Sequence, residues 1–123
     1  IASARVGASE VMGLDLDPVA IEVARQNAVQ NQVSETLSLH QGSLPSPRVN
    51  PASFDLAVAN ISAKVVTEIA PDLVAAVRPG GVVIASGVLA ENQDSVRDAL
   101  TAAGAIPSRS LTEDGWVLLV ATV

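Results

Sequence analysis

The 123-residue chain is about one domain long, and 49% of its residues are apolar, which is enough for a hydrophobic core. It has no cysteine and one histidine, which excludes a disulfide scaffold, a thiolate zinc site and a cysteine nucleophile, and leaves no metal cluster in view. Seven basic against thirteen acidic residues give a net charge of −6, which argues against direct nucleic acid binding. No apolar run reaches the roughly 18 to 20 residues of a membrane span, and the first residues lack the signal-peptide pattern, so we expect a cytoplasmic protein.

The first elements read as strand, turn and helix. Residues 1–7 are typical of the end of a helix, and residues 10–14 form a short apolar run that leads into Asp15. Asp17-Pro18 pairs a good N-cap with a proline at the first helical position, which predicts a helix to about residue 30. Its apolar spacing predicts an inward face made of Val19, Val23 and Ala24.

The middle of the chain repeats this alternation. Residues 37–40 are predicted to form a strand, and residues 41–53 a loop, because three prolines block regular structure there. Residues 54–59 have the character of a buried strand that ends at Asn60. A helix is then expected over residues 63–77, capped by Ser62 and broken by Pro79-Gly80-Gly81.

The last third closes on a different pattern. Residues 82–86 form a near-continuous apolar run, as parallel strands do when both faces are covered. A helix over residues 93–103 is expected to stop at Gly104. Residues 106–111 and 116–123 are predicted to form an antiparallel hairpin around residues 112–115, with Trp116 closing the core beneath it.

Three alternations of strand and helix predict a doubly wound, three-layer α/β fold with a C-terminal antiparallel hairpin. Right-handed crossovers gather the loops that follow the strands at one edge of the sheet. A ligand of such a fold binds at this carboxyl edge. The side chains that end the strands are therefore the candidate functional residues.

Asp15 is the strongest of these candidates. A carboxylate at the end of a strand that feeds a helix can accept both hydroxyls of a ribose, which predicts an adenosine-bearing cofactor. The alternative is that Asp15 only solvates the loop or shares capping with Asp17. For Asp17 itself, capping is a sufficient explanation, because Pro18 follows it.

Three further positions remain open. Asn60 either accepts a hydrogen bond from an incoming amine and also touches the cofactor, or forms an Asx turn that ends its strand. Gly42 and Ser43 end the intervening strand and would face the adenine of a bound nucleoside, although small residues there are permissive rather than diagnostic. His40 lies in an apolar strand, and a structural role is favoured over a catalytic one.

Several motifs together carry a resemblance: Gly-Leu-Asp-Leu-Asp-Pro at residues 13–18, Ala59-Asn60-Ile61, Arg78-Pro-Gly-Gly81 and Gly115-Trp116. With them the chain resembles the class I S-adenosylmethionine-dependent methyltransferases, and among these the family that methylates ribosomal protein L11. The resemblance covers nearly all of the chain. It implies methyl transfer from S-adenosylmethionine to an amine of a protein substrate, with a ribosomal protein as the expected partner.

The resemblance also implies roles for single residues. Asp15 is expected on the cofactor ribose, Gly42 and Ser43 near the adenine, and Asn60 near the transferred methyl group, as a catalytic residue. Ser43 stands where many relatives carry an Asp that contacts the adenine amino group, which puts that contact in doubt.

The glycine-rich loop and first strand of this Rossmann-like fold have no counterpart in residues 1–123. We therefore interpret the chain as part of a catalytic domain, and expect it to be inactive alone and prone to self-association through exposed strand edges.

Two other functions remain possible from the residues alone. A nicotinamide-dependent oxidoreductase also places an acid on a ribose, although the absence of tyrosine and the closing hairpin weigh against it. A non-catalytic Rossmann-like domain would keep the fold without the chemistry.

Overall fold

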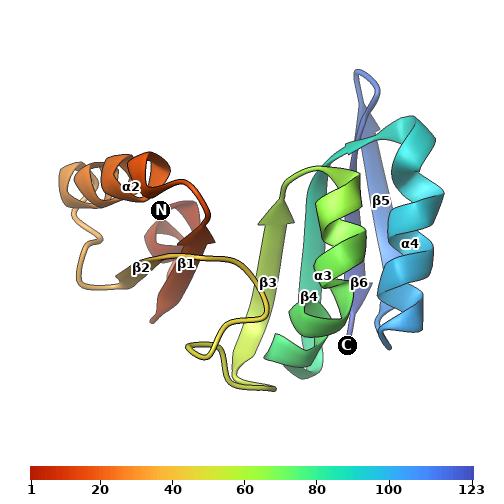
Figure 1. The fold of residues 1–123 in the computed structure, drawn as a ribbon, viewed down its shortest axis with the longest axis horizontal. Coiled ribbons are helices and arrows are strands. Elements are labelled where there is room, and N and C mark those ends of the chain that lie inside the picture. Colours follow the sequence, from red (N-terminus) through yellow and green to blue (C-terminus); the bar gives the residue numbers. More distant parts are fainter. The chain divides into compact units, whose positions relative to one another are not determined.

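The computed structural model describes residues 1–123, which divide into two compact units, Ile1–Ser46 and Pro47–Val123. The first unit contains α1 (Ala2–Arg5), β1 (Val11–Asp15), α2 (Pro18–Gln30) and β2 (Leu37–Gln41). The second contains β3 (Phe54–Asn60), α3 (Ala63–Ala76), β4 (Val77–Leu89), the short 3₁₀ helix η1 (Ala90–Asn92), α4 (Gln93–Ala102), β5 (Ile106–Glu113) and β6 (Trp116–Thr122). Figure 1 shows these elements in chain order.

In the first unit, β1 and β2 form a parallel pair against which α2 packs. The helix begins as the sequence predicts. Asp17 occupies the N-cap, where its carboxylate accepts a hydrogen bond from the backbone N–H of Val19 at 2.8 Å, and Pro18 is the first helical residue. The capping role of Asp17 is therefore confirmed.

The predicted inward face of α2 is wrong for the two valines and right for Ala24. Val19 is 66% exposed and Val23 48% exposed, whereas Ile21 and Ala28 are buried and Ala24, on the same side as these two, is half-buried. Residues seven positions apart on a helix lie on the same side, and this side packs against the β1–β2 pair. Valine spacing alone did not distinguish the two apolar sides of this helix.

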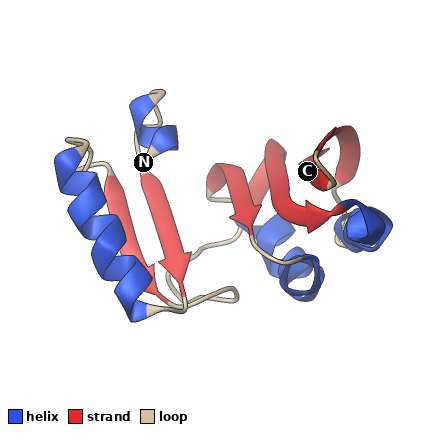
Figure 2. Ribbon diagram, turned by 90° about the horizontal axis from the view of Figure 1, so that it is seen from above, coloured by secondary structure: helices blue, strands red, loops and turns tan.

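In the second unit, the four strands are ordered β3-β4-β6-β5. The β3–β4 pair is parallel, and β6 pairs antiparallel with both β4 and β5. Figure 2 shows α3 and α4 against one face of this sheet. Alternate residues of β6, and of β4 from Gly81 to Ala85, point into the core beneath these helices, and the fully buried examples include Val83, Ala85, Leu119 and Ala121.

The closing hairpin is confirmed. Asp114 and Gly115 both have positive φ, +49° and +80°, as the central residues of a type I′ turn do. Gly104, with a φ of +102°, follows the end of α4, where the sequence predicts the helix stop.

Two details, one at each end of α3, differ from expectation. The helix ends at Ala76, before Pro79-Gly80-Gly81, and that tripeptide lies inside β4. The reason is that the end of the chain pairs with it: the Gly80 N–H donates to the carbonyl of Val123 at 2.7 Å. Ser62 is at the N-cap of α3, but its hydroxyl makes no capping hydrogen bond.

Trp116 does not close the core. It is 54% exposed, whereas the next residue, Val117, is buried beneath the helices. Successive side chains of a strand point to opposite faces, so burying Val117 turns the indole to the face of the sheet that α3 and α4 do not cover.

The two units differ in their cores, and we expect them to differ in stability. Only three of the nineteen buried apolar side chains, Ile21, Ala28 and Val33, belong to the first unit. A parallel pair of short strands with so little burial is marginal in water. In the isolated chain, we expect the amides of β1 and β2 to exchange with solvent about two powers of ten faster than those of β4 and β6. Uniform protection, measured by hydrogen-exchange mass spectrometry, would contradict this expectation.

Candidate cofactor site

Three predicted site residues meet at the carboxyl end of the β1–β2 pair. Asp15 is the last residue of β1 and lies opposite Gln41, the last residue of β2. The next residue, Gly42, donates its backbone N–H to the carbonyl of Asp15 at 2.9 Å, and Ser43 follows directly. The parallel register therefore brings Asp15, Gly42 and Ser43 to one edge, as the sequence predicts.

The two oxygens of the Asp15 carboxylate have different surroundings. Its Oδ1 accepts a hydrogen bond from the backbone N–H of Asp17 at 2.9 Å, which holds the turn that starts α2. Its Oδ2 accepts no hydrogen bond within the chain, and the side chain is exposed. One oxygen thus supports the turn, and the other is open to a hydroxyl of a ligand such as ribose.

Gly42 leaves room beside this acid. Its φ is +147°, a conformation that favours glycine, and a side chain built on it would meet no atom within 4 Å. Ser43 is half-buried beside this space. His40 is half-buried within β2, opposite Leu14, in agreement with a structural role.

In the second unit, Asn60 is the last residue of β3 and lies opposite Ser86 of β4. Its neighbour Ile61 donates a backbone N–H to the carbonyl of Ser86 at 3.2 Å, so the parallel pairing continues to the carboxyl end of β3. The Asn60 side chain is exposed there and can meet a ligand.

Sequence reasoning missed a residue, Gly87, whose lack of a side chain leaves room for the Asn60 amide. Gly87 has a φ of +75° and lies in an irregular step of β4 between Ala85 and Val88. A Cβ on Gly87 would lie 2.9 Å from Oδ1 of Asn60 and 3.0 Å from the carbonyl of Ile61. Only glycine fits this position without displacing the Asn60 amide. A glycine directly after the apolar run of residues 82–86 is the signal that could have pointed to it.

Neither a metal centre nor a membrane span emerges from the structure. No group of three or more His, Cys, Asp or Glu side chains is arranged to hold a metal ion. None of the helices has the length and apolarity required to cross a bilayer.

The fold has close counterparts among solved methyltransferases. The crystal structure of a ribosomal protein L11 methylase from Lactobacillus delbrueckii subsp. bulgaricus superposes with a TM-score of 0.90 at 26% identity, over 98% of this chain and 62% of that one. An RNA methyltransferase from Salinibacter ruber, solved with S-adenosyl-L-homocysteine, shares the fold with a TM-score of 0.74 at 19% identity, over 98% of this chain and 70% of that one. The α/β Rossmann-like fold of the class I methyltransferases is thereby confirmed.

The sequence comparison is more specific. The family model described as "Ribosomal protein L11 methyltransferase (PrmA)" matches residues 1–123. A ribosomal protein L11 methyltransferase from Symbiobacterium thermophilum is 38% identical over 121 residues, which are 98% of this chain and 38% of that protein. The chain belongs to the ribosomal protein L11 methyltransferase family, which is S-adenosylmethionine-dependent.

The chain spans well under half the length of this relative. The family assignment favours the methyltransferase hypothesis over the nicotinamide-dependent oxidoreductase. The roles of Asp15, Gly42, Ser43 and Asn60 toward a cofactor remain predictions that rest on the geometry described above.

Proposed function

We propose that this chain is part of the catalytic domain of a cytoplasmic enzyme that transfers a methyl group from S-adenosylmethionine to an amine of a ribosomal protein. One observation carries the proposal within the family: Asp15 presents an unused carboxylate oxygen at a strand end, directly beside the open turn at Gly42. This is where a parallel α/β sheet binds an adenosine-bearing ligand.

Each residue has a defined task in this proposal. Oδ2 of Asp15 has two lone pairs with which to accept both ribose hydroxyls, and the space beside Gly42 admits the adenine. Ser43 offers a neutral hydroxyl, whose contact with the adenine amino group is weaker than that of a carboxylate would be. When bound, S-adenosylmethionine supplies an activated methyl group, which leaves alignment and exclusion of water to the protein.

Asn60 aligns the amine. Its Oδ1, for which Gly87 leaves room, accepts a hydrogen bond from the N–H of the attacking amine. The lone pair of the amine nitrogen then points away from Asn60. The amine must be neutral to attack. At pH 7 this costs a lysine with a pKa near 10.4 about 4.6 kcal/mol, and an α-amine near 7.8 about 1 kcal/mol. An α-amino group is therefore the easier target, and a lysine needs a more desolvated pocket.

We further propose that the first strand and the glycine-rich loop of the cofactor site come from outside residues 1–123. The support is that one edge of β1 and one edge of β3 have no partner strand within their sheets. The isolated chain should then bind S-adenosylmethionine weakly and transfer no methyl group, and its unpaired edges should favour self-association.

The test of the function is a methyl-transfer assay with the full-length protein that contains this chain. Ribosomal proteins from cells that lack the modification are incubated with methyl-tritiated S-adenosylmethionine and separated. We expect label in one ribosomal protein, at its α-amino group, at lysines or at both. Label in no ribosomal protein, despite bound cofactor, would contradict the proposed substrate and favour a non-catalytic domain.

A further inference from the structure

Glu113, Trp116 and Leu89 lie side by side on three neighbouring strands. Trp116 of β6 is paired with Glu113 of β5 on one side and with Leu89 of β4 on the other. Directly paired residues of a sheet project from the same face, so these three side chains form a row. The apolar members are open to solvent, since Trp116 is 54% and Leu89 42% exposed.

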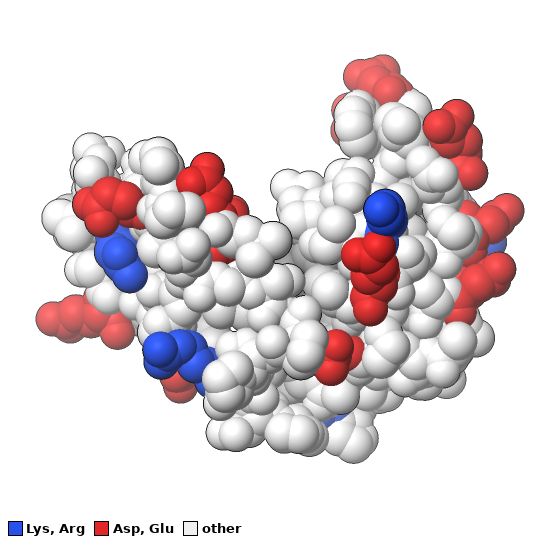
Figure 3. Space-filling model, in the orientation of Figure 1, with Lys and Arg blue, Asp and Glu red and all other residues white.

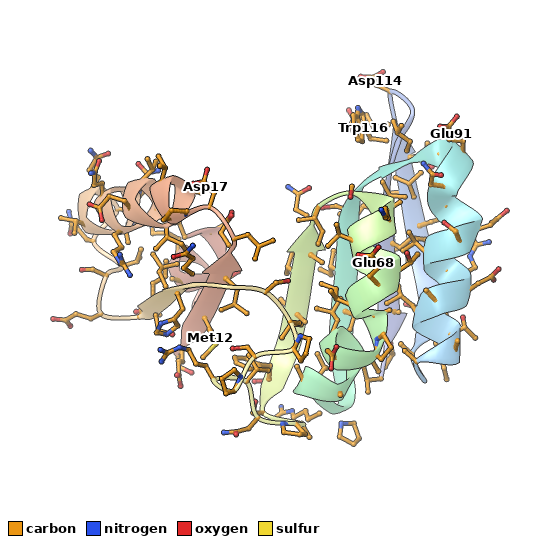
Figure 4. The ribbon with its side chains drawn as sticks, viewed as in Figure 1. Met12, Asp17, Glu68, Glu91, Asp114 and Trp116 are labelled. Atoms are coloured by element: carbon orange, nitrogen blue, oxygen red, sulfur yellow. The ribbon has the colours of Figure 1, made fainter.

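Two further acids lie at the same end of the second unit (Figure 4). Asp114 lies in the hairpin turn, and Glu91 lies on η1, which is held to that turn by a hydrogen bond from the Ala90 N–H to the Gly115 carbonyl at 2.9 Å. Figure 4 shows Glu91, Asp114 and Trp116 at the same end of the second unit. We call Leu89, Glu91, Glu113, Asp114 and Trp116 the hairpin surface.

The charge of the hairpin surface has no internal compensation. The four ion pairs of the chain involve other acids: Glu22, Asp55, Glu68 and Asp94. Seen from the side that α3 and α4 cover, Figure 3 shows acidic side chains at this end of the second unit, with no Lys or Arg among them in that view. Three carboxylates outside these ion pairs, at the same end of the unit as an exposed indole (Figure 4), are complementary to a basic segment, because the indole face attracts ammonium and guanidinium groups and packs on their aliphatic stems.

Within the second unit, the hairpin surface is also placed to meet a substrate whose amine lies at Asn60. Asn60 lies opposite Ser86, and Leu89 follows three residues later on the same strand, about 10 Å along it. Asn60 and Trp116 both project from the face that α3 and α4 leave uncovered, because the alternate residues, Ala59 and Val117, are buried under these helices.

From these observations we propose that the hairpin surface docks a lysine- or arginine-rich segment of the protein substrate, near the amine to be methylated. The identity of the partner as a substrate rests on the proposed function, but the binding of a basic segment does not. Trp116 contributes the apolar and cation–π contact, and the three acids attract the segment and set its orientation.

The chain contains its own reporter for this test. Trp116 is its single tryptophan, and it has no tyrosine, so tryptophan emission comes from the hairpin surface alone. A lysine-rich 15-residue peptide is titrated into the 123-residue chain. We expect a saturable blue shift of the emission, weakened at high salt, and no response to a glutamate-rich peptide or to an oligothymidine.

Two triple variants with the same net charge distinguish the effect of the hairpin-surface acids from the effect of the overall charge of the chain. Replacing Glu91, Glu113 and Asp114 by their amides should weaken peptide binding about five- to tenfold. Replacing the equally exposed Glu10, Glu35 and Asp98 by their amides changes the net charge by the same amount and should leave binding unchanged. Equal weakening by both triple variants, no response to the peptide, or an equal response to oligothymidine would overturn the proposal.

The full-length enzyme provides a second measurement. Trp116→Ala should raise the KM for the protein substrate about tenfold or more, while the Kd of S-adenosylmethionine stays the same. An unchanged KM in an enzyme that binds cofactor and transfers methyl groups would overturn the docking proposal and leave the proposed function standing. Trp116 emission that shifts with chain concentration alone would instead identify a second copy as the occupant.

Discussion

Asp15→Ala in the full-length enzyme should weaken binding of S-adenosylmethionine by one to three powers of ten. A carboxylate that accepts ribose hydroxyls makes charge-assisted hydrogen bonds worth about 1.5 to 3 kcal/mol each, and the substitution removes them. The structure adds a second effect. Asp15→Ala also removes the acceptor for the Asp17 N–H, which we expect to lower the free energy of unfolding by about 1 kcal/mol.

Asp15→Asn separates these two effects. The amide keeps an oxygen for the Asp17 N–H but loses the charge, so stability should be retained while cofactor affinity falls. Asp17→Ala is the opposite control, since it removes the cap on Val19 and should cost about 1 kcal/mol of stability with affinity nearly intact. Calorimetric titration and thermal melts measure both quantities. Tight cofactor binding by Asp15→Asn together with weak binding by Asp17→Ala would show that the wrong aspartate was chosen.

Gly87→Ala should reduce kcat about a hundredfold without changing the Kd of the cofactor. The added methyl group would approach Oδ1 of Asn60 to 2.9 Å, so the amide must move, and a misplacement of about 1 Å at a reacting group is enough for such a loss. Asn60→Ala should cause a loss of the same size. The double variant should be little worse than either single one, because both act through the same amide.

Gly104→Ala is the matched control for Gly87→Ala. It also places alanine at a positive φ, +102°, but a Cβ there would meet nothing within 4 Å. Both variants should lose about 1 to 2 kcal/mol of stability through backbone strain. Only Gly87→Ala should lose kcat. Equal activity of the two variants under conditions where both are folded would show that Gly87 does not position Asn60.

Local signals predicted most of the fold. The Asp17-Pro18 pair and the Asp114-Gly115 turn each specify one backbone geometry, and both are found where expected. The errors concern features that depend on distant partners. The exposure of Val19 is set by which side of α2 packs on β1 and β2, and the extent of β4 by its pairing with Val123.

The candidate site divides in the same way. Strand ends are visible in the sequence, so Asp15, Gly42 and Asn60 are predicted as site residues from their position alone. The hydrogen bond from Asp17 to Asp15 depends on the shape of the turn, and the fit of Gly87 against Asn60 on the pairing of β3 with β4. The exposure of Trp116 follows from which face of β6 the helices cover, which the hydrophobic pattern around it does not reveal.

The most direct test of the account is a calorimetric titration of the full-length protein with S-adenosylmethionine and, separately, with NADH. We predict one S-adenosylmethionine site with micromolar or tighter affinity that depends on Asp15, and no heat from NADH. Binding of NADH in place of S-adenosylmethionine, or of neither ligand by a folded protein, would contradict the assignment of this sheet edge to a methyl-donating cofactor.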